Sequence, residues 1–269
     1  MPRHTAELLN QLQHADGVLV SVDSVQGSGP REVGAWMAVF VKGEVGTIGG
    51  GQLEWQAIAQ SRQALQGLAA LPTQQRVALG PSLGQCCGGA VELRFELMSA
   101  QDLPQLQQRL TPALTPVALF GGGHVGQALV QVLSHLPFAV RWIDSRDEIF
   151  PAQVPLNVVC EHSEPVQSAV PGLAAQSRVL IMSFSHAEDL DVVAACLKRQ
   201  RALGDIGFIG LIGSKTKWAT FRHRLEDRGF SAQEMARITC PIGVSGISGK
   251  EPEVIAVAVA AQLLQVSRQ

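Results

Sequence analysis

The stretch PVALFGGGHVGQALVQVL, residues 116–133, carries the strongest fold signal in the chain. An apolar run ends at Gly121 and apolar residues at helical spacing resume after Gly126, which predicts a strand, a glycine turn and a helix. Gly121, Gly123 and Gly126 fit the spacing G-x-G-x-x-G, and Asp144 ends the next apolar run about twenty residues later. Together these features predict a Rossmann-like fold, in which the start of the helix binds a phosphate and the acid binds a ribose.

The rest of the second half repeats this rhythm. Short apolar runs that predict further strands, with helical patterns between them, lie at residues 156–161, 178–184 and 206–213. Ser214 is a candidate helix N-cap, and Ser231 with Glu234 fits a capping box. Strands that alternate with helices predict a doubly wound parallel sheet in an α/β domain. Two prolines in LTPALTP, residues 110–116, mark a linker. We therefore expect an N-terminal domain over residues 1–110 and a Rossmann-like domain over residues 116–269.

The first half reads as a smaller α+β domain. A strand is predicted at residues 17–25, a hairpin at residues 34–51 with its turn near Lys42 and Gly43, and another strand at residues 91–98. The helix between them has one expected apolar face, made of Trp55, Ile58, Ala59, Leu65 and Leu68. Near the N-terminus, Thr5 is a plausible N-cap for a short helix.

Composition limits the classes of function. Lysine plus arginine is 21 and aspartate plus glutamate is 23, giving a net charge of −2, so we expect no nucleic-acid partner, because such binding needs a basic face. The most apolar stretch, residues 254–266, is too short to span a bilayer and predicts a helix buried on nearly every face. The N-terminal residues lack the apolar segment of a secretory signal, so we expect a cytoplasmic protein whose cysteines are thiols.

The segment SLGQCCGG, residues 82–89, places Cys86 and Cys87 side by side between glycines. Neighbouring cysteines can be bridged only through a strained ring, and no C-x-x-C spacing indicates a structural zinc site. Flanking glycines let backbone amides stabilise a thiolate and let a bulky ligand approach. A soft thiolate suits a metal centre or sulfur chemistry. The alternative is that the two cysteines are adjacent by chance.

Other segments offer candidate anion sites. Arg31 follows a glycine-proline turn and can pair with phosphate or carboxylate oxygens, although a surface arginine in a turn is the commoner case. Three glycines at residues 49–51 lead into a helix whose first turn contains Glu54. Lys250 stands beside a helix start and binds an anion or is simply solvated. His124, inside the glycine loop, either contacts a ligand or caps the turn.

These motifs occur together in one family. The segments GSGPREVGAWM, GTIGGGQLE, GQCCGG, LFGGGHVGQAL, IGLIGSKTKW and PIGVSGISGKEPEVIAVAVAAQLL resemble, in the same order, the XdhC/CoxI family of xanthine dehydrogenase accessory proteins. The resemblance extends from about Gly17 to Leu264. It implies a carrier of molybdenum cofactor, not an enzyme. Such a carrier holds Mo-molybdopterin while a cysteine desulfurase helps to add sulfur, and passes it to xanthine dehydrogenase, commonly as a homodimer.

The resemblance also assigns expected roles. Cys86 or Cys87 would coordinate molybdenum or shield its sulfido group, while the glycine loop, Arg31 and Lys250 would bind the cofactor's phosphate. One segment departs from the family pattern T-H-D-H-x-x-D. At residues 183–189 this chain reads SFSHAED, so His186 and Asp189 match whereas Phe184 and Ser185 do not. An exposed helix start is the simpler interpretation there.

Two alternatives remain open from the sequence. The first is an NAD(P)-binding oxidoreductase that uses the glycine motif and Asp144, whose carboxylate suits a ribose diol. Against it, the chain has no tyrosine and so no Tyr-x-x-x-Lys pair. The second is a scaffold that binds the dehydrogenase and the desulfurase without touching the cofactor.

Overall fold

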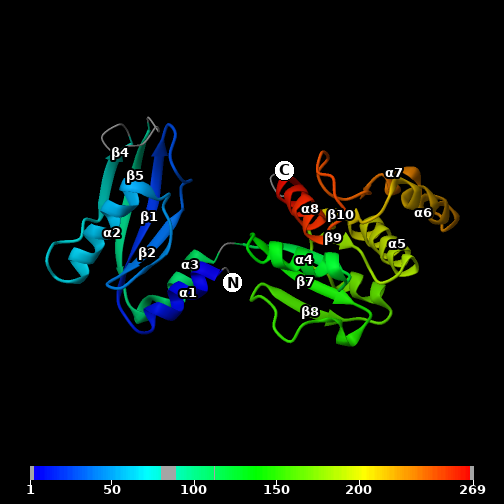
Figure 1. The fold of residues 1–269 in the computed structure, drawn as a ribbon, viewed down its shortest axis with the longest axis horizontal. Coiled ribbons are helices and arrows are strands. Elements are labelled where there is room, and N and C mark those ends of the chain that lie inside the picture. Colours follow the sequence, from blue (N-terminus) through cyan, green and yellow to red (C-terminus); the bar gives the residue numbers. More distant parts are fainter. Residues whose placement is uncertain (1–2, 80–88, 112, 267–269) are drawn as a thin grey trace. The chain divides into compact units, whose positions relative to one another are not determined.

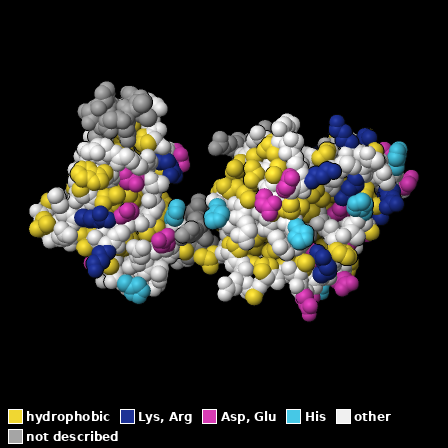
Figure 2. All heavy atoms as spheres, in the orientation of Figure 1, with side chains coloured by type: hydrophobic (Ala, Val, Ile, Leu, Met, Phe, Trp, Pro, Cys, Tyr) yellow, Lys and Arg dark blue, Asp and Glu magenta, His cyan; other side chains and the backbone are white. Residues whose placement is uncertain are grey.

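The computed structural model of the chain describes residues 3–79, 89–111 and 113–266. The chain divides into two compact units, Met1–Thr111 and Pro112–Gln269, and each is described by itself. Figure 1 traces both units in sequence colours. Figure 2 shows that basic and acidic side chains both occur on the visible face of each unit. Among the described helices, none is both long and apolar enough to span a bilayer.

The first unit is an antiparallel sheet with helices on both faces (Figure 1). Its strands lie in the order β3-β2-β1-β5-β4. The elements are α1 (Arg3–Leu12), β1 (Gly17–Gln26), β2 (Trp36–Phe40), β3 (Glu44–Gly46), α2 (Gly51–Leu65), β4 (Gln74–Ala78), β5 (Ala90–Met98), η2 (Ala100–Asp102) and α3 (Leu103–Leu110). Helix α2 packs on one face through Leu53 and Ala57, and α1 and α3 pack on the other through Leu8, Leu12 and Leu106.

The second unit is a Rossmann-like domain with a parallel six-stranded sheet. Its elements are β6 (Thr115–Phe120), α4 (His124–Leu133), β7 (Phe138–Asp144), η3 (Asp147–Ile149), β8 (Val158–His162), η4 (Val166–Gly172), β9 (Arg178–Ile181), α5 (His186–Leu203), β10 (Phe208–Leu211), α6 (Lys215–Asp227), α7 (Ala232–Met235), β11 (Ile238–Thr239) and α8 (Pro252–Val266). The strand order β8-β7-β6-β9-β10-β11 matches the doubly wound order 3-2-1-4-5-6.

Helices cover both faces of this parallel sheet. Helices α4 and α8 enclose one core with β6 and β7, where Trp142 is the largest buried side chain. The other core lies between the sheet and η4, α5, α6 and α7. The order of strands reverses between β6 and β9, so the crevice where ligands bind in this topology lies at the carboxyl ends of those two strands.

Several local predictions agree with the structure because local hydrogen bonds fix them. Gly43 adopts a positive φ of 96° in the β2–β3 turn, as the hairpin pattern indicates. The Ser214 side chain accepts from Lys217 N and caps α6. Ser231 and Glu234 form the capping box of α7. Cys160, Cys196 and Cys240 are free thiols, of which Cys196 is fully buried.

Other predictions are wrong. The buried residues of α2 are Leu53, Ala57 and Ser61, whereas Trp55 is 64% exposed and Leu68 is 74% exposed. Ile58 and Leu65 of the expected face are partly buried against the same core, so the prediction fails at Trp55 and Leu68. Thr5 lies inside α1, and its hydroxyl donates to Leu110 O of α3 rather than capping the helix.

The last helix is buried on nearly every face, as predicted, with one exposed apolar residue. Val257 of α8 is 52% exposed, although Ala256 and Ala258 on either side of it are buried, Ala258 beside the loop at Gly243. Two strands lack a prediction. Strand β4 contains mostly polar residues at the sheet edge, and β11 has only two residues, so neither has a sufficient apolar pattern.

Candidate functional site

The glycine loop after β6 is shaped by two close backbone contacts. Gly121 has φ +126°, and a Cβ on it would lie 2.0 Å from the carbonyl oxygen of Met182, at the end of β9. A Cβ on Gly126 would lie 2.1 Å from Gly121 O. Both positions therefore require glycine so that β9 and α4 can approach the loop.

Gly123 differs from its neighbours because it is not needed for packing. A Cβ on Gly123 would meet nothing within 4 Å, and its φ of −70° is ordinary. The first hydrogen bond of the helix runs from Gln127 N to Gly123 O at 2.9 Å, so the N–H groups before Gln127 precede the helical ladder. This geometry leaves room for an anion at the start of α4, where the helix dipole favours negative charge.

Asp144, at the end of β7, is engaged by protein donors. Its side chain is 1% exposed, and Oδ2 accepts from Gly122 N at 2.6 Å. Arg146 folds back so that its Nε donates to Oδ1 at 2.8 Å and its terminal nitrogen donates to Oδ2 at 3.0 Å. Burial raises the pKa of the Asp144 carboxyl, but hydrogen bonds from Arg146 and Gly122, with the Arg146 charge, hold that pKa below its ordinary value.

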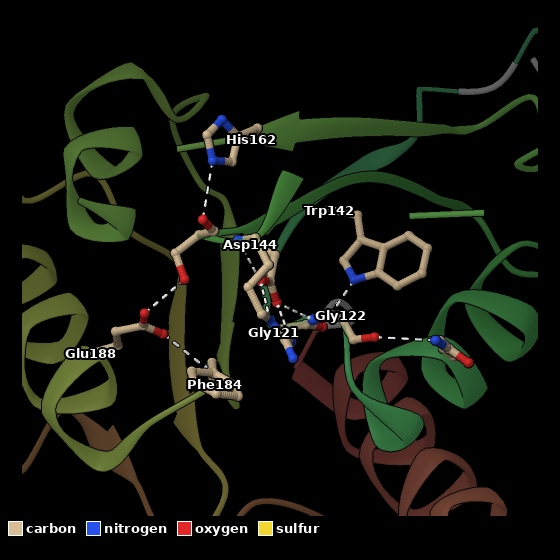
Figure 3. Close-up of polar contacts among 10 residues, drawn as sticks. Gly121, Gly122, Trp142, Asp144, His162, Phe184 and Glu188 are labelled. Carbon is tan, nitrogen blue, oxygen red and sulfur yellow. Dashed lines mark hydrogen bonds and ion pairs between the residues drawn. The ribbon is translucent and has the colours of Figure 1, made fainter. Parts of the chain in front are cut away.

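The same edge of the sheet carries a wider polar network (Figure 3). The Arg146 guanidinium stacks on the exposed ring of Phe184, 4.5 Å from its centroid. Glu188 of α5 accepts from Ser145 Oγ at 2.7 Å and from Phe184 N at 3.1 Å. His162 Nε2 lies 3.0 Å from the carbonyl oxygen of Ser145. The loops after β7, β8 and β9 are thereby joined beside the glycine loop.

The segment that departs from the family pattern has a structural role. Ser185 caps α5, accepting from Glu188 N at 3.2 Å, and His186 is the exposed first residue of that helix. Asp189 is buried, and it accepts from Lys217 Nζ at 2.6 Å and from Ser183 N at 2.7 Å. The carboxylate therefore joins the loop after β9 to α6.

His124 and Lys250 lie at helix starts. His124 is the exposed first residue of α4, and within the described residues no side-chain hydrogen bond caps this helix. Lys250 is exposed, two residues before α8 begins, and its backbone N donates to the Glu251 carboxylate at 2.9 Å. Neither side chain is tied to another group in the described part of the chain, so both remain predictions as ligand contacts.

In the first unit, three glycine segments meet. A Cβ on Gly49 would lie 2.5 Å from Cβ of Pro30 and 3.4 Å from Cγ of Arg31. A Cβ on Gly89 would lie 2.4 Å from Gln26 O and 2.5 Å from Ser28 O. The turn at residues 26–31 therefore packs against both the glycine loop before α2 and the residue that ends the cysteine segment.

Glu54 holds the loop before α2 closed. Its Oε2 accepts from Ile48 N at 2.9 Å and from Gly50 N at 3.1 Å, and it also binds the Thr47 hydroxyl. The Arg31 side chain is 39% exposed, and the ion pair of its guanidinium with Glu32 is long at 3.7 Å. Arg31 is thus available beside the Gly49 loop, whereas the Gly50 amide is occupied.

Cys86 and Cys87 lie outside the described residues. The chain on either side is described, and Leu79 N donates to Gly89 O at 2.7 Å, which closes the base of the segment between them. Among the described residues no group of three or more His, Cys, Asp or Glu side chains could hold a metal ion. The predicted metal ligands therefore stay a prediction.

Sequence reasoning missed Arg146, Glu188 and the Asp189–Lys217 pair as members of the polar network. Arg146 carried the clearest available signal, because a cation two residues after an acid at a strand end can fold back onto it. No local pattern indicated Glu188 or Lys217. Their partners, Ser145 and Asp189, lie 43 and 28 residues away in the sequence.

Comparison with known proteins adds a family. Residues 117–263 match the XdhC Rossmann domain, and residues 11–74 match the XdhC and CoxI family. The chain is 30% identical over 249 residues to the uncharacterized protein YqeB of Escherichia coli (strain K12). The match includes 91% of this chain but only 42% of YqeB, so the chain spans less than half of that relative.

A solved structure has the same fold. It is described as a xanthine dehydrogenase from Bacillus halodurans, and it superposes with a TM-score of 0.80 over 100% of this chain and 96% of its own. The sequences are 20% identical, so this likeness concerns the fold alone.

Proposed function

This chain belongs to the XdhC and CoxI family, and from that membership we propose that it serves xanthine dehydrogenase maturation as a carrier of molybdenum cofactor. In this proposal the chain is an accessory protein, and Mo-molybdopterin is its cargo. The chain holds the cargo while a cysteine desulfurase supplies sulfur, and then delivers it to apo-xanthine dehydrogenase. We expect the carrier to act as a homodimer.

The chemistry of the cargo sets two requirements. One end is a molybdenum bound by dithiolene sulfurs, and the other end is a phosphate. The metal end needs a soft ligand, which Cys86 or Cys87 would supply as a thiolate. The phosphate end needs backbone amides and cations in a place that a bulky group can reach.

The observation that carries the proposal is the meeting of three glycine segments in the first unit. Gly49, Gly89 and the turn ending at Arg31 come from distant parts of the sequence, and their contacts leave no room for side chains. Cys87 is separated from Gly89 by a single residue. Gly89, the first described residue after the cysteine segment, therefore lies against the turn that ends at Arg31, whose guanidinium pairs with Glu32 at a long 3.7 Å.

The start of α4 supports the phosphate role. Gly121 and Gly126 are required by packing, whereas Gly123 leaves open space that no neighbour needs. Open space beside unpaired helix N–H groups is what an approaching phosphate requires. His124 would lie at the rim of that space, and Lys250 would add charge at the start of α8.

The test measures cargo retention directly. The full chain is mixed anaerobically with free molybdenum cofactor and desalted, and the retained molybdenum and pterin are quantified. We expect both to be retained together, and we expect the loaded chain to activate apo-xanthine dehydrogenase. The double variant Cys86→Ala/Cys87→Ala should lose molybdenum, while Cys160→Ala should not. Retention and activation at wild-type level by the double variant would refute the proposal.

Matched variants test the anion sites. Arg31 and Arg62 have similarly exposed side chains, 39% and 37%, but only Arg31 lies beside the Gly49 loop. Arg31→Gln should weaken retention about tenfold, equivalent to one charge-assisted hydrogen bond, whereas Arg62→Gln should not. Gly123→Ala should weaken retention without loss of folding, because its Cβ meets no protein atom.

The oxidoreductase alternative has one favourable observation, the doubly wound strand order with its glycine loop. The engagement of Asp144 weighs against it. Both carboxylate oxygens accept from Arg146, and Gly122 N adds a further bond, so a ribose diol would have to displace Arg146. Titration of the full chain with NADH or NADPH, followed by nicotinamide fluorescence, distinguishes the two functions. Tight binding without cofactor retention would favour the oxidoreductase.

A further inference from the structure

A pocket of about 300 Å³ opens beside α4, on the α4 face of the parallel sheet. It lies between α4 and residues 149–155, a segment that begins at the last residue of η3. Phe150 supplies its aromatic surface, and behind it the buried Trp142 indole packs edge-on at 5.3 Å between ring centroids. The pocket is thus made by different elements from the crevice at the carboxyl ends of β6 and β9.

The chemistry of the lining is specific. No charged side chain lines the pocket, and its polar side chains are three carboxamides, Gln127, Gln131 and Gln153. The rest of the lining is aromatic, aliphatic or proline. An apolar pocket with a few polar groups is typical of small-molecule sites, and this volume is at the lower end of their range. Carboxamides both donate and accept, so they match a ligand with adjacent donor and acceptor atoms.

We propose that this pocket binds a small, flat, uncharged heterocycle of one or two fused rings that carries a lactam-like donor and acceptor. The ring packs against Phe150 and the aliphatic part of the lining, and a carboxamide completes its hydrogen bonds. An anionic ligand is disfavoured, since no cation lines the pocket to pair with it.

The pocket residues also brace the glycine loop. Trp142 Nε1 donates to Gly121 O at 2.9 Å, and Gln127 Nε2 donates to Gly122 O at 3.2 Å (Figure 3). The Ile149 side chain fills the space where a Cβ on Gly122 would lie, with Cγ1 2.6 Å from that position. Because three lining residues touch two residues of the loop, occupation of the pocket alters the environment of Gly121 and Gly122.

The test uses three probes of similar shape. Quinazolin-4-one carries the lactam pair, naphthalene lacks hydrogen-bonding atoms, and 2-naphthoate adds a negative charge. Each is titrated into the ¹⁵N-labelled full chain, and amide shifts are followed. We expect quinazolin-4-one to bind about tenfold more tightly than naphthalene, equivalent to one or two hydrogen bonds, and 2-naphthoate to bind most weakly. Shifts should cover the lining and extend to Gly121 and Gly122.

Variants separate the pocket from nonspecific binding. Gln131→Leu keeps side-chain size and does not touch the loop braces, so it should weaken quinazolin-4-one binding about tenfold. Gln233→Leu, at an exposed position of α7 outside the pocket, should have no effect. Val154→Trp should fill the pocket and abolish binding. Should Gln131→Leu fail to fold, Val154→Trp decides.

Three results would overturn the proposal. The first is the absence of shifts at the solubility limit of quinazolin-4-one. The second is binding of 2-naphthoate as tight as that of quinazolin-4-one. The third is unchanged binding to the folded Val154→Trp variant.

Discussion

Replacing Asp144 with asparagine is the sharpest test of the network at the carboxyl end of β7. Asparagine keeps the shape but puts an NH₂ group against donors of Arg146 or Gly122. Removing one partner of a buried ion pair costs about 3–5 kcal/mol. The Arg146 side chain is 35% exposed and can recover part of its hydration. We therefore expect the free energy of unfolding to fall by about 2–3 kcal/mol, the range of one strong hydrogen bond to a charged group.

The pH dependence of this loss follows from the pKa of Asp144. The folded chain holds that pKa below its ordinary value of 3.8, so the folded state takes up the proton less readily than the unfolded state. The stabilisation of the folded state by the ionised Asp144 carboxylate is fully present above the ordinary pKa. It is lost as the pH falls through the pKa of Asp144 in the folded chain. Asparagine does not titrate. The difference in free energy of unfolding between the wild type and Asp144→Asn should therefore be constant from pH 7 to about pH 5 and should narrow below about pH 4.

The assay must report on the second unit alone, because two units need not unfold together. Urea-dependent hydrogen exchange of peptides from β6 and β7 meets that need. Asp191→Asn is the control, since the Asp191–Arg228 pair in the same unit is exposed by 40% and 44% and should contribute about 0–1 kcal/mol. Equal effects of the two variants, or a gap that widens on acidification, would refute the account of Asp144.

Further substitutions test the remaining contacts. Gly126→Ala puts a Cβ 2.1 Å from Gly121 O and should cost about 3 kcal/mol by urea titration, whereas Gly123→Ala should stay within about 0.5 kcal/mol of wild type. Equal effects would contradict the assigned packing. Lys217→Met leaves the Asp189 carboxylate buried and unpaired and should cost about 3–5 kcal/mol. Adding Asp189→Asn should recover much of this loss, because the amide still accepts from Ser183 N without a charge. Burial raises the pKa of the Cys196 thiol to about 12, so iodoacetamide at pH 8 should modify the partly exposed Cys160 before Cys196, which should react only after unfolding, as read by peptide mass spectrometry.

Only part of the candidate site could be predicted from the sequence. The G-x-G-x-x-G spacing located the turn and the helix after it, but it assigned one role to all three glycines. The structure separates them, because Gly121 and Gly126 face backbone oxygens and Gly123 faces open space. Asp144 stands at the predicted strand end, yet its partners are Arg146 and Gly122.

What the sequence alone determined is the set of features fixed within a few residues. Alternating apolar runs and helical patterns gave the α/β order, glycine and proline gave the turns, and Ser214 and Ser231 gave helix starts, because backbone sterics and local hydrogen bonds decide each of these. Only the tertiary structure decided which side of α2 is buried and which distant segments touch. The packing of Gly49 on Pro30 and of Gly89 on Gln26 depends on strand register and on the packing of loops. These arise from the simultaneous placement of segments across the whole unit, which no local pattern specifies.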